Sequence, residues 1–363
     1  MKIFIVDTIN NIPSHKQFQD LALSLTDKGH KVIHISDTKR DNYGINKVLV
    51  RKNRLKDIPF YFKLFVLIVL ILFGSSLIGG LGYFTVSNMF SLSPEDISNG
   101  LTGSESHIPT NAVRILQAFM SLGMFLVPAL AYSQLSKDRE IEFFGFNKNV
   151  PIAVWGLVIL LMFAISPFID GIVYLNYNLP YPDFLSGFIE RLVAQQEMLS
   201  EQMEKLTEMT SLSTFFLNLL IIAIIPAIGE EWLFRGVIQK LFKEHFRSTH
   251  KAIWLTAFFF ALLHQSVFYF LGLWILGALL GYLKEWSGNI WLPVLAHLIN
   301  NSLILVVLYF APNLMGDLDN IGFEWLSFLP SLIGSGLLIY LIYKLLMRFN
   351  STEAHAQITK EET

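Results

Sequence analysis

The chain has 363 residues, of which 53% are hydrophobic and 14% aromatic, while only 15% are charged. Together with a mean hydropathy of +0.49, this composition is typical of a protein that lies largely in lipid. The net charge of −2 and the dispersed basic residues give no reason to expect a nucleic-acid partner. The absence of cysteine excludes disulfides, thiolate metal sites and a cysteine nucleophile.

Residues 1–58 differ in character from the rest and predict a small cytoplasmic segment. Two short apolar runs, at 3–6 and 32–35, have the pattern of β-strands, and Ser14 is a candidate N-cap of an amphipathic helix between them. We therefore predict a β-α-β-like unit ahead of the membrane domain. The sequence does not indicate its role.

From residue 60 onward, apolar runs of about 20 residues, long enough to cross a bilayer, recur along the chain. They predict an all-α integral membrane domain over residues 60–348 with about eight transmembrane helices. The expected spans are 60–84, 111–133, 151–175, 212–234, 252–267, 268–286, 289–311 and 325–348. The fifth and sixth are short and could form a tight or partly re-entrant hairpin. A polar C-terminal tail, 349–363, follows.

Loop charges predict how these spans are oriented. Eight basic residues lie between positions 39 and 63, whereas segments 85–110 and 312–324 contain no Lys or Arg. By the positive-inside rule, the N- and C-termini are predicted to be cytoplasmic, with the protein in the cell membrane. The stretch 188–210, predicted outside, reads as an amphipathic helix that packs on its own domain or lies on the membrane surface.

Two adjacent carboxylates and an arginine interrupt the fourth span. The stretch from Ile221 to Gly236 reads I-I-A-I-I-P-A-I-G-E-E-W-L-F-R-G. An isolated charge at the centre of a membrane helix costs roughly 2.5–3.5 kcal/mol on insertion scales, so these residues indicate function. Glu231 and Arg235 are four apart and are expected to pair, whereas Glu230 lies about 100° away around the helix axis and is left free to act.

Three further polar residues are expected at the same depth. At about 1.5 Å per residue, Glu230 lies about 15–25 Å and His264 about 20 Å from the nearest basic anchors. His297 and Asn301 lie about 12 and 18 Å beyond the turn that ends at Asn289. A single histidine more often only bonds a neighbouring helix. One carboxylate, two imidazoles and an amide in one bundle can activate water and hold an oxyanion.

These residues form three motifs with a known counterpart. E-E-W-L-F-R contains Glu230, Glu231 and Arg235, F-A-L-L-H contains Phe260 and His264, and H-L-I-N-N contains His297 and Asn301. They resemble, in the same order, the EExxxR, FxxxH and HxxxN (or HxxxB) signatures of the CAAX-protease and bacteriocin-processing family, also called CPBP or Abi. The specific resemblance covers residues 212–311.

The resemblance implies an intramembrane endopeptidase. Carried over to this chain, Glu230 would deprotonate the attacking water with His264 assisting. His297 and Asn301 would stabilise the tetrahedral oxyanion. The supporting residues would be Glu231, Arg235 and Phe260, of which Phe260 is most simply a packing side chain.

Metal use is left open by the sequence. Family members are often called metalloproteases, and Glu230, His264 and His297 could supply three ligands and an open position for a catalytic Zn²⁺. A glutamate and a histidine can also activate water without a metal, and the chain has no H-E-x-x-H helix. The metal-free alternative is preferred.

The resemblance implies a membrane-embedded or lipid-modified protein or peptide as substrate. It is either a prenylated CAAX-type protein or a membrane peptide such as a bacteriocin precursor. The alternative function is a non-catalytic membrane immunity or scaffold protein that uses the same helical bundle. A transporter is disfavoured, because no matched pair of halves is found.

Overall fold

The computed structural model describes residues 3–5, 31–33, 58–102, 108–136, 143–180, 182–312 and 325–361. Of these, residues 3–5, 31–33, 99–102, 325 and 353–361 are described by their backbone alone. The chain divides into two compact units, Met1–Lys52 and Asn53–Thr363.

The described part of the first unit consists of two short strands, β1 (Ile3–Ile5) and β2 (Lys31–Ile33). They pair in parallel, with Ile3 opposite Lys31 and Ile5 opposite Ile33. Both lie where the sequence predicts strands. The helix expected between them lies outside the described residues, so the complete β-α-β unit stays a prediction.

The second unit is all-α in its described residues, as predicted for the membrane domain. Its helices are α2 (Phe60–Phe90), α3 (Pro94–Thr102), α4 (Thr110–Ser121), η1 (Leu122–Leu126), α5 (Val127–Ser136), α7 (Ile152–Tyr177), η2 (Asp183–Leu185), α8 (Ser186–Thr207), α9 (Leu212–Asn218), η3 (Leu219–Ile224), α10 (Ile225–Glu231), η4 (Trp232–Ile238), α11 (Gln239–Phe246), α12 (Thr249–Leu263), α13 (Phe270–Ser287), α14 (Trp291–Phe310) and α16 (Trp325–Glu361).

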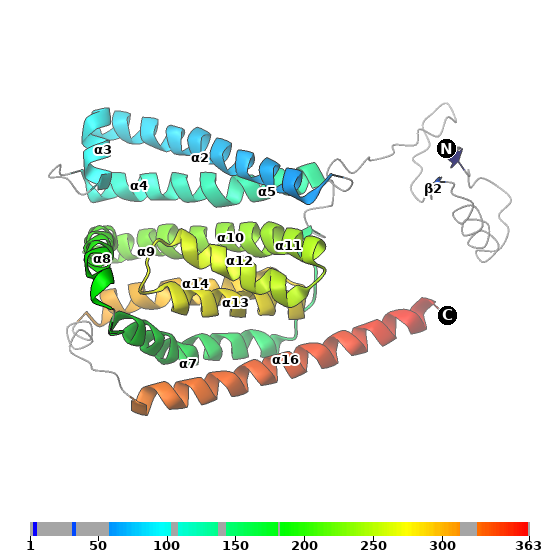
Figure 1. The fold of residues 1–363 in the computed structure, drawn as a ribbon. Helices are drawn as coiled ribbons and strands as arrows, with labels where there is room; N and C mark the ends of the chain where they lie inside the picture. The colour runs from blue at the N-terminus through cyan, green and yellow to red at the C-terminus, as the bar shows by residue number, and fades with distance from the viewer. Residues whose placement is uncertain are drawn as a thin grey trace. The chain divides into compact units, whose positions relative to one another are not determined.

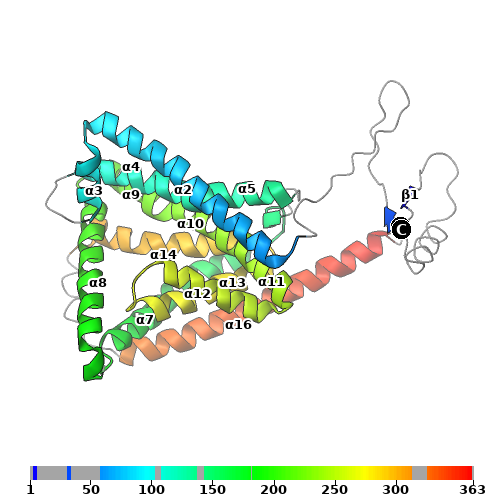
Figure 2. The ribbon, with the colours of Figure 1, turned by 45° about the horizontal axis from the view of Figure 1, so that its top comes forward.

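Within this unit the helices pack in side-by-side layers (Figures 1 and 2). One layer consists of α2 against α4, η1 and α5, and on the opposite side α16 packs along α7. Between them, α14 contacts α7, α13, α10 and η3. The helix α8 crosses the ends of the other helices (Figure 2). The arrangement places α14 at the centre, next to the segment that contains the two adjacent glutamates.

Side-chain packing follows these layers. One buried cluster joins α7, α13, α14 and α16 and includes Leu161, Leu280, Leu292 and Ile342. A second joins α2, α5, η4 and the start of α14. Large apolar side chains also cover the outer surface, for example Leu72 at 62% and Leu337 at 64% exposure. An apolar outer surface suits helices that face acyl chains rather than water.

Six helical segments of the described chain are long and apolar enough to cross a membrane. They are Phe60–Phe90, Thr110–Ser136, Ile152–Tyr177, Leu212–Phe246, Trp291–Phe310 and Leu326–Thr352. The predicted count of eight is therefore not confirmed. The helix α12 has only 15 residues, about 22 Å, which is shorter than the roughly 30 Å hydrocarbon core. The last turn of α13 contains the charged residues Lys284 and Glu285, and the helix packs along α12 as expected for a short hairpin.

Candidate active site

One continuous helical segment, Leu212–Phe246, supplies both adjacent glutamates. Its α-helical turns are interrupted twice by π-helix, at η3 and at η4. The short helix α10 between them ends with Glu230 and Glu231. Such π-turns are rare and occur often at functional sites. Ser211 begins the segment with a capping box to Thr214, which satisfies backbone donors at the helix end.

Glu231 is the centre of a fully buried ion pair. Its Oε1 accepts a hydrogen bond of 2.6 Å from Nη1 of Arg235, and both side chains have zero exposure. The same oxygen lies 2.9 Å from Nδ1 of His297. The pairing of Glu231 with Arg235 is the one expected from their spacing. The contact with His297 was not expected, because it joins two residues far apart in the sequence.

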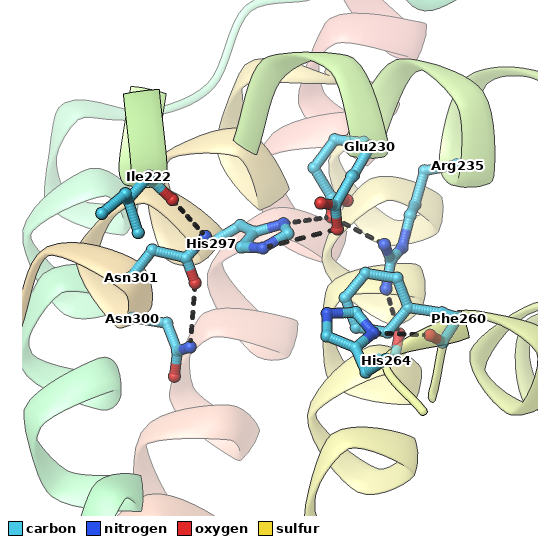
Figure 3. Close-up of polar contacts among 10 residues, drawn as sticks. Ile222, Glu230, Arg235, Phe260, His264, His297, Asn300 and Asn301 are labelled. Atoms are coloured by element: carbon cyan, nitrogen blue, oxygen red, sulfur yellow. Dashed lines mark hydrogen bonds and ion pairs between the residues drawn. The ribbon is translucent and has the colours of Figure 1, made fainter. Parts of the chain in front are cut away.

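Glu230 lies beside this pair with a different environment. It is 9% exposed, and its Oε2 lies 3.9 Å from Nε2 of His297. Among the described residues, this oxygen has no hydrogen-bond partner. Figure 3 shows the His297 ring directed toward Glu230. The imidazole thus has one nitrogen on the side of each glutamate. Among the described residues, Oε2 of Glu231 also lacks a hydrogen-bond partner, but Oε1 of Glu231 is bound by Arg235 and His297.

Phe260 is the packing residue that links the parts of the site. Its ring lies 4.6 Å from Cζ of Arg235, and its centroid is 4.7 Å from that of His264 and 5.7 Å from that of His297. The side chain is 1% exposed. A cation over an aromatic face is favourable by about 0.5–2 kcal/mol. Arg235 also donates from Nη2 to the carbonyl of Gly277, at 2.9 Å.

His264 lies at the C-terminal end of α12 and is exposed. Its Nδ1 lies 2.7 Å from the carbonyl oxygen of Phe260, so Nδ1 carries the proton in the neutral ring and Nε2 is an acceptor. Within the described chain, His264 makes no hydrogen bond or ion pair with Glu230 (Figure 3). The loop that follows is held to α8, since Ser266 Oγ donates to Gln196 at 2.5 Å.

Asn301 faces the helix that contains the glutamates. Its Nδ2 lies 3.5 Å from the carbonyl oxygen of Ile222, and its Oδ1 accepts from Asn300 at 3.2 Å (Figure 3). Pro226 has no backbone N–H, so it cannot form the α-helical bond to Ile222. The 3.5 Å contact with Ile222 shows that the Asn301 amide lies on the side of α14 that faces the glutamate helix. Because this contact is long, the amide is only weakly bound.

Comparison with known proteins bears on these residues directly. The family model of the Rce1-like type II CAAX prenyl endopeptidases matches residues 212–303, which contain all three motifs. These residues form an Rce1-like domain. The family resemblance predicted from the motifs is thereby confirmed. The chain is also 35% identical over 89 residues to the uncharacterised protein YpbD of Bacillus subtilis (strain 168). That match covers 23% of this chain and 41% of YpbD. No solved structure matches the chain.

The Rce1-like domain does not bring the three candidate zinc ligands together. Across the described residues, no group of three or more His, Asp or Glu side chains is placed to hold a metal ion. Glu230 and His297 approach each other, but in the described chain His264 makes no hydrogen bond or ion pair with either, and Nδ1 of His297 is held by Glu231. The residues in this arrangement do not fit the candidate Zn²⁺ site, which the sequence left open.

One buried residue beside the Rce1-like domain was not found from the sequence. Arg114, inside the second span, is 4% exposed. It donates to Asn218 Oδ1 at 2.7 Å and to the carbonyl oxygens of Leu206 and Glu208. Arg114 thus connects α4, α8 and the start of the domain. Arg114 could have been found from the sequence by the reasoning applied to Glu230, because a charged side chain within a membrane span requires a partner.

Proposed function

We propose that this chain is an intramembrane endopeptidase that hydrolyses a peptide bond with water activated by Glu230. The observation that supports this most directly is the difference between two adjacent glutamates. Glu231 is bound through Oε1 by both Arg235 and His297, whereas Glu230 makes no hydrogen bond to either residue and its Oε2 lies 3.9 Å from Nε2 of His297. Both glutamates keep an Oε2 without a hydrogen-bond partner among the described residues. The match to the Rce1-like family model supports peptide-bond hydrolysis as the class of reaction.

In the proposed reaction Glu230 is the general base. A water molecule next to its unpartnered oxygen gives up a proton to the carboxylate and attacks the scissile carbonyl carbon. The C–N bond then breaks, and Glu230 returns the proton to the leaving amine. His264 assists from the end of α12 by accepting a hydrogen bond at Nε2, since its Nδ1 is directed at the Phe260 carbonyl.

His297 and Asn301 stabilise the negative charge that develops on the carbonyl oxygen. Glu231 holds Nδ1 of His297 and so fixes the orientation of the ring, with Nε2 on the side of Glu230. When both nitrogens are protonated, Nε2 can donate to the oxyanion. Asn301 can do the same from Nδ2, because its 3.5 Å contact with Ile222 is long and readily exchanged.

The substrate in this proposal is a membrane-embedded or lipid-modified protein or peptide, with a prenylated CAAX-type protein as the first candidate. Six apolar helices in the described chain support a bilayer as its surroundings. Basic residues in the loops support cytoplasmic N- and C-termini in the cell membrane. A prenyl chain would lie among acyl chains and bring the peptide to the membrane surface.

The test is cleavage of a farnesylated CAAX peptide by the full chain reconstituted in lipid vesicles. Glu230→Gln keeps the shape of the side chain and removes the base, so turnover is expected to fall by about 10²–10⁴. Glu197→Gln, on the exposed surface of α8, is the matched control and should cleave like the unmodified protein. Cleavage that persists in Glu230→Gln at the rate of the control would show that Glu230 is not the base.

A further inference from the structure

The loop between α12 and α13 begins with His264, and its far end is held by α7. Nδ2 of Asn176 donates to the carbonyl oxygens of Val267 and Phe268 at 3.0 and 2.9 Å. The ring of Phe268 is 2% exposed and packs against Tyr177 of α7. These contacts fix the end of the loop, but they do not involve the residues next to His264.

The residues that directly follow His264 are bonded to α8 instead. Oγ of Ser266 donates to Oε1 of Gln196 at 2.5 Å. A longer contact of 3.5 Å joins Nε2 of Gln195 to the carbonyl oxygen of Gln265. The helix α8 crosses the ends of the other helices (Figure 2), so it can bond a loop at the end of one of them. The short bond makes Gln196 the main link between α8 and the start of the loop.

Gln196 is a polar residue on the inner, mostly apolar face of α8. The partly or fully buried side chains of that face include Ile189, Leu192, Val193, Leu199 and Leu206. Gln196 follows Leu192 by four residues and precedes Leu199 by three, which places all three on one side of the helix. A leucine at this position would continue the apolar face. The glutamine instead presents an acceptor to Ser266.

The backbone between His264 and Ser266 is strained. Gln265 has a φ of +55°, in the left-handed region that costs free energy for a residue other than glycine. Such a residue keeps its conformation only where the surrounding contacts hold it. The contacts from α8 are made to Gln265 itself and to the residue after it, so they are placed to hold this turn.

This turn affects His264 because it ends α12 at Leu263. In a continued α-helix, the backbone N–H of His264 would donate to the carbonyl of Phe260, four residues earlier. Here that N–H donates to Ala261 at 3.2 Å, and the Phe260 carbonyl lies 2.7 Å from Nδ1 of the His264 ring. The end of the helix thus leaves this carbonyl to the ring, which fixes the neutral tautomer with Nε2 as the acceptor.

We propose that Gln196 is a positioning residue for His264. Through Ser266 it holds the turn after α12, and so it keeps the His264 ring on the Phe260 carbonyl. The catalytic part of this inference rests on the proposed proteolysis, in which His264 assists Glu230, whereas the orientation of the ring does not. The hydrogen bonds of Gln196 in the described chain are to Ser266 and Ser200, so it acts on the reaction through the loop.

The first measurement follows the His264 ring without any substrate. The full chain is labelled with ¹⁵N-histidine in detergent micelles at about pH 8, where an ordinary imidazole is neutral. The signals of His264 are those that are missing from His264→Gln. In the unmodified protein they are expected to show a ring with its proton on Nδ1. Gln196→Leu should shift them toward the averaged tautomers of a free ring, and unchanged signals would overturn the proposal.

The second measurement is cleavage of the farnesylated peptide in lipid vesicles. Gln196→Leu is expected to lower kcat about tenfold, the effect of roughly one hydrogen bond, with KM unchanged because the proposal gives Gln196 no contact with the peptide. Gln196→Glu keeps an acceptor for Ser266 and should retain most of the activity. The matched control, Gln117→Leu on the exposed face of α4, should cleave like the unmodified protein. An unchanged kcat in Gln196→Leu, or an equal loss in Gln196→Glu, contradicts the positioning role.

The partner residue tests the same link from the other side. Ser266→Ala should lower kcat by a similar factor, and Ser266→Thr, which keeps the hydroxyl, should restore it. Gln196→Leu combined with Ser266→Ala should be no slower than either single variant, because both remove the same bond. Losses that multiply in the double variant would show that the two residues act independently, and the proposal would then be wrong. Gln196→Leu continues the apolar face of α8, so misfolding is not expected to cause its effect.

Failure of this proposal and failure of the proteolysis give different results. If Glu230→Gln cleaves as fast as its control, Glu230 is not the base, yet the ¹⁵N signals still show whether Gln196 orients His264. If Glu230→Gln is inactive while Gln196→Leu changes neither the signals nor kcat, the proteolysis stands and the positioning role is refuted.

Discussion

The buried pair of Glu231 and Arg235 makes a quantitative prediction about stability. Both side chains have zero exposure, and the carboxylate also holds Nδ1 of His297. Glu231→Leu leaves the guanidinium without its partner inside the bundle. Removing one member of a buried pair typically costs about 3–5 kcal/mol, so we expect a loss of that size in the free energy of unfolding.

The matched variant is the double substitution Glu231→Leu with Arg235→Met. Replacing both members of a buried pair by apolar residues is often neutral. Nδ1 of His297 loses Glu231 in both variants, so the carbonyl of Gly277 is the one group that loses its partner in the double variant alone, at a cost of about 1–3 kcal/mol. Set against the roughly 3–5 kcal/mol cost of the unpaired guanidinium, we expect the double variant to be more stable than the single variant by about 2 kcal/mol.

The assay is reversible unfolding in mixed micelles by titration with sodium dodecyl sulfate, followed by tryptophan fluorescence. Equal losses of unfolding free energy in the single and double variants would refute the reasoning, because they would mean that the unpaired guanidinium is not the source of the cost. Peptide cleavage should remain low in both variants, since neither restores the carboxylate that orients His297.

Three further outcomes are expected. Asn301→Ala should lower kcat in the peptide assay by about 10²–10³ with little change in KM, as for loss of one oxyanion donor. Asn300→Ala is the control and should have a smaller effect, because its amide acts only through Asn301. Equal effects of the two variants would contradict the role of Asn301. Phe260→Ala should reduce the free energy of unfolding by about 3–5 kcal/mol, measured by the same detergent titration, and a change below about 1 kcal/mol would mean that the ring is not the packing centre described above. Arg114→Gln should loosen α8, which would be detected as faster proteolysis between residues 186 and 207. An unchanged cleavage pattern would show that the hydrogen bonds from Arg114 to Leu206 and Glu208 do not hold α8 in place.

The part of the site predicted from sequence was the part set by local helix geometry. Spacing along one helix was enough to pair Glu231 with Arg235 and to leave Glu230 outside that pair. Counting residues from the turn that ends at Asn289 also indicated that His297 would reach the depth of the glutamates, and the 3.9 Å approach to Glu230 agrees with this. The catalytic roles of these residues remain predictions.

The features that were missed depend on contacts between helices. The contact between His297 and Glu231 requires the relative rotation of α14 and α10, which no spacing within either helix determines. The count of eight spans is not confirmed, because α12 ends at Leu263, which hydropathy along the chain does not show. Arg114 was overlooked because a single cation near the end of an apolar run resembles an interfacial residue, whereas in the fold it is buried.

The two π-helical segments, η3 and η4, lie on either side of the short helix α10 that contains the neighbouring glutamates. A uniform α-helix turns about 100° per residue, which separates Glu230 from Glu231 but also fixes where every later side chain points. The π-turns of η4 begin directly after Glu231 and include Arg235, and they widen the turn over which the arginine reaches back to its partner. The π-turns of η3 lie close to Pro226, which has no backbone N–H and therefore cannot donate the helical hydrogen bond to the carbonyl of Ile222. Asn301 Nδ2 partly replaces that hydrogen bond, at 3.5 Å. The irregular turns thus lie on both sides of the glutamates, at the positions where α12, α13 and α14 supply the remaining polar groups.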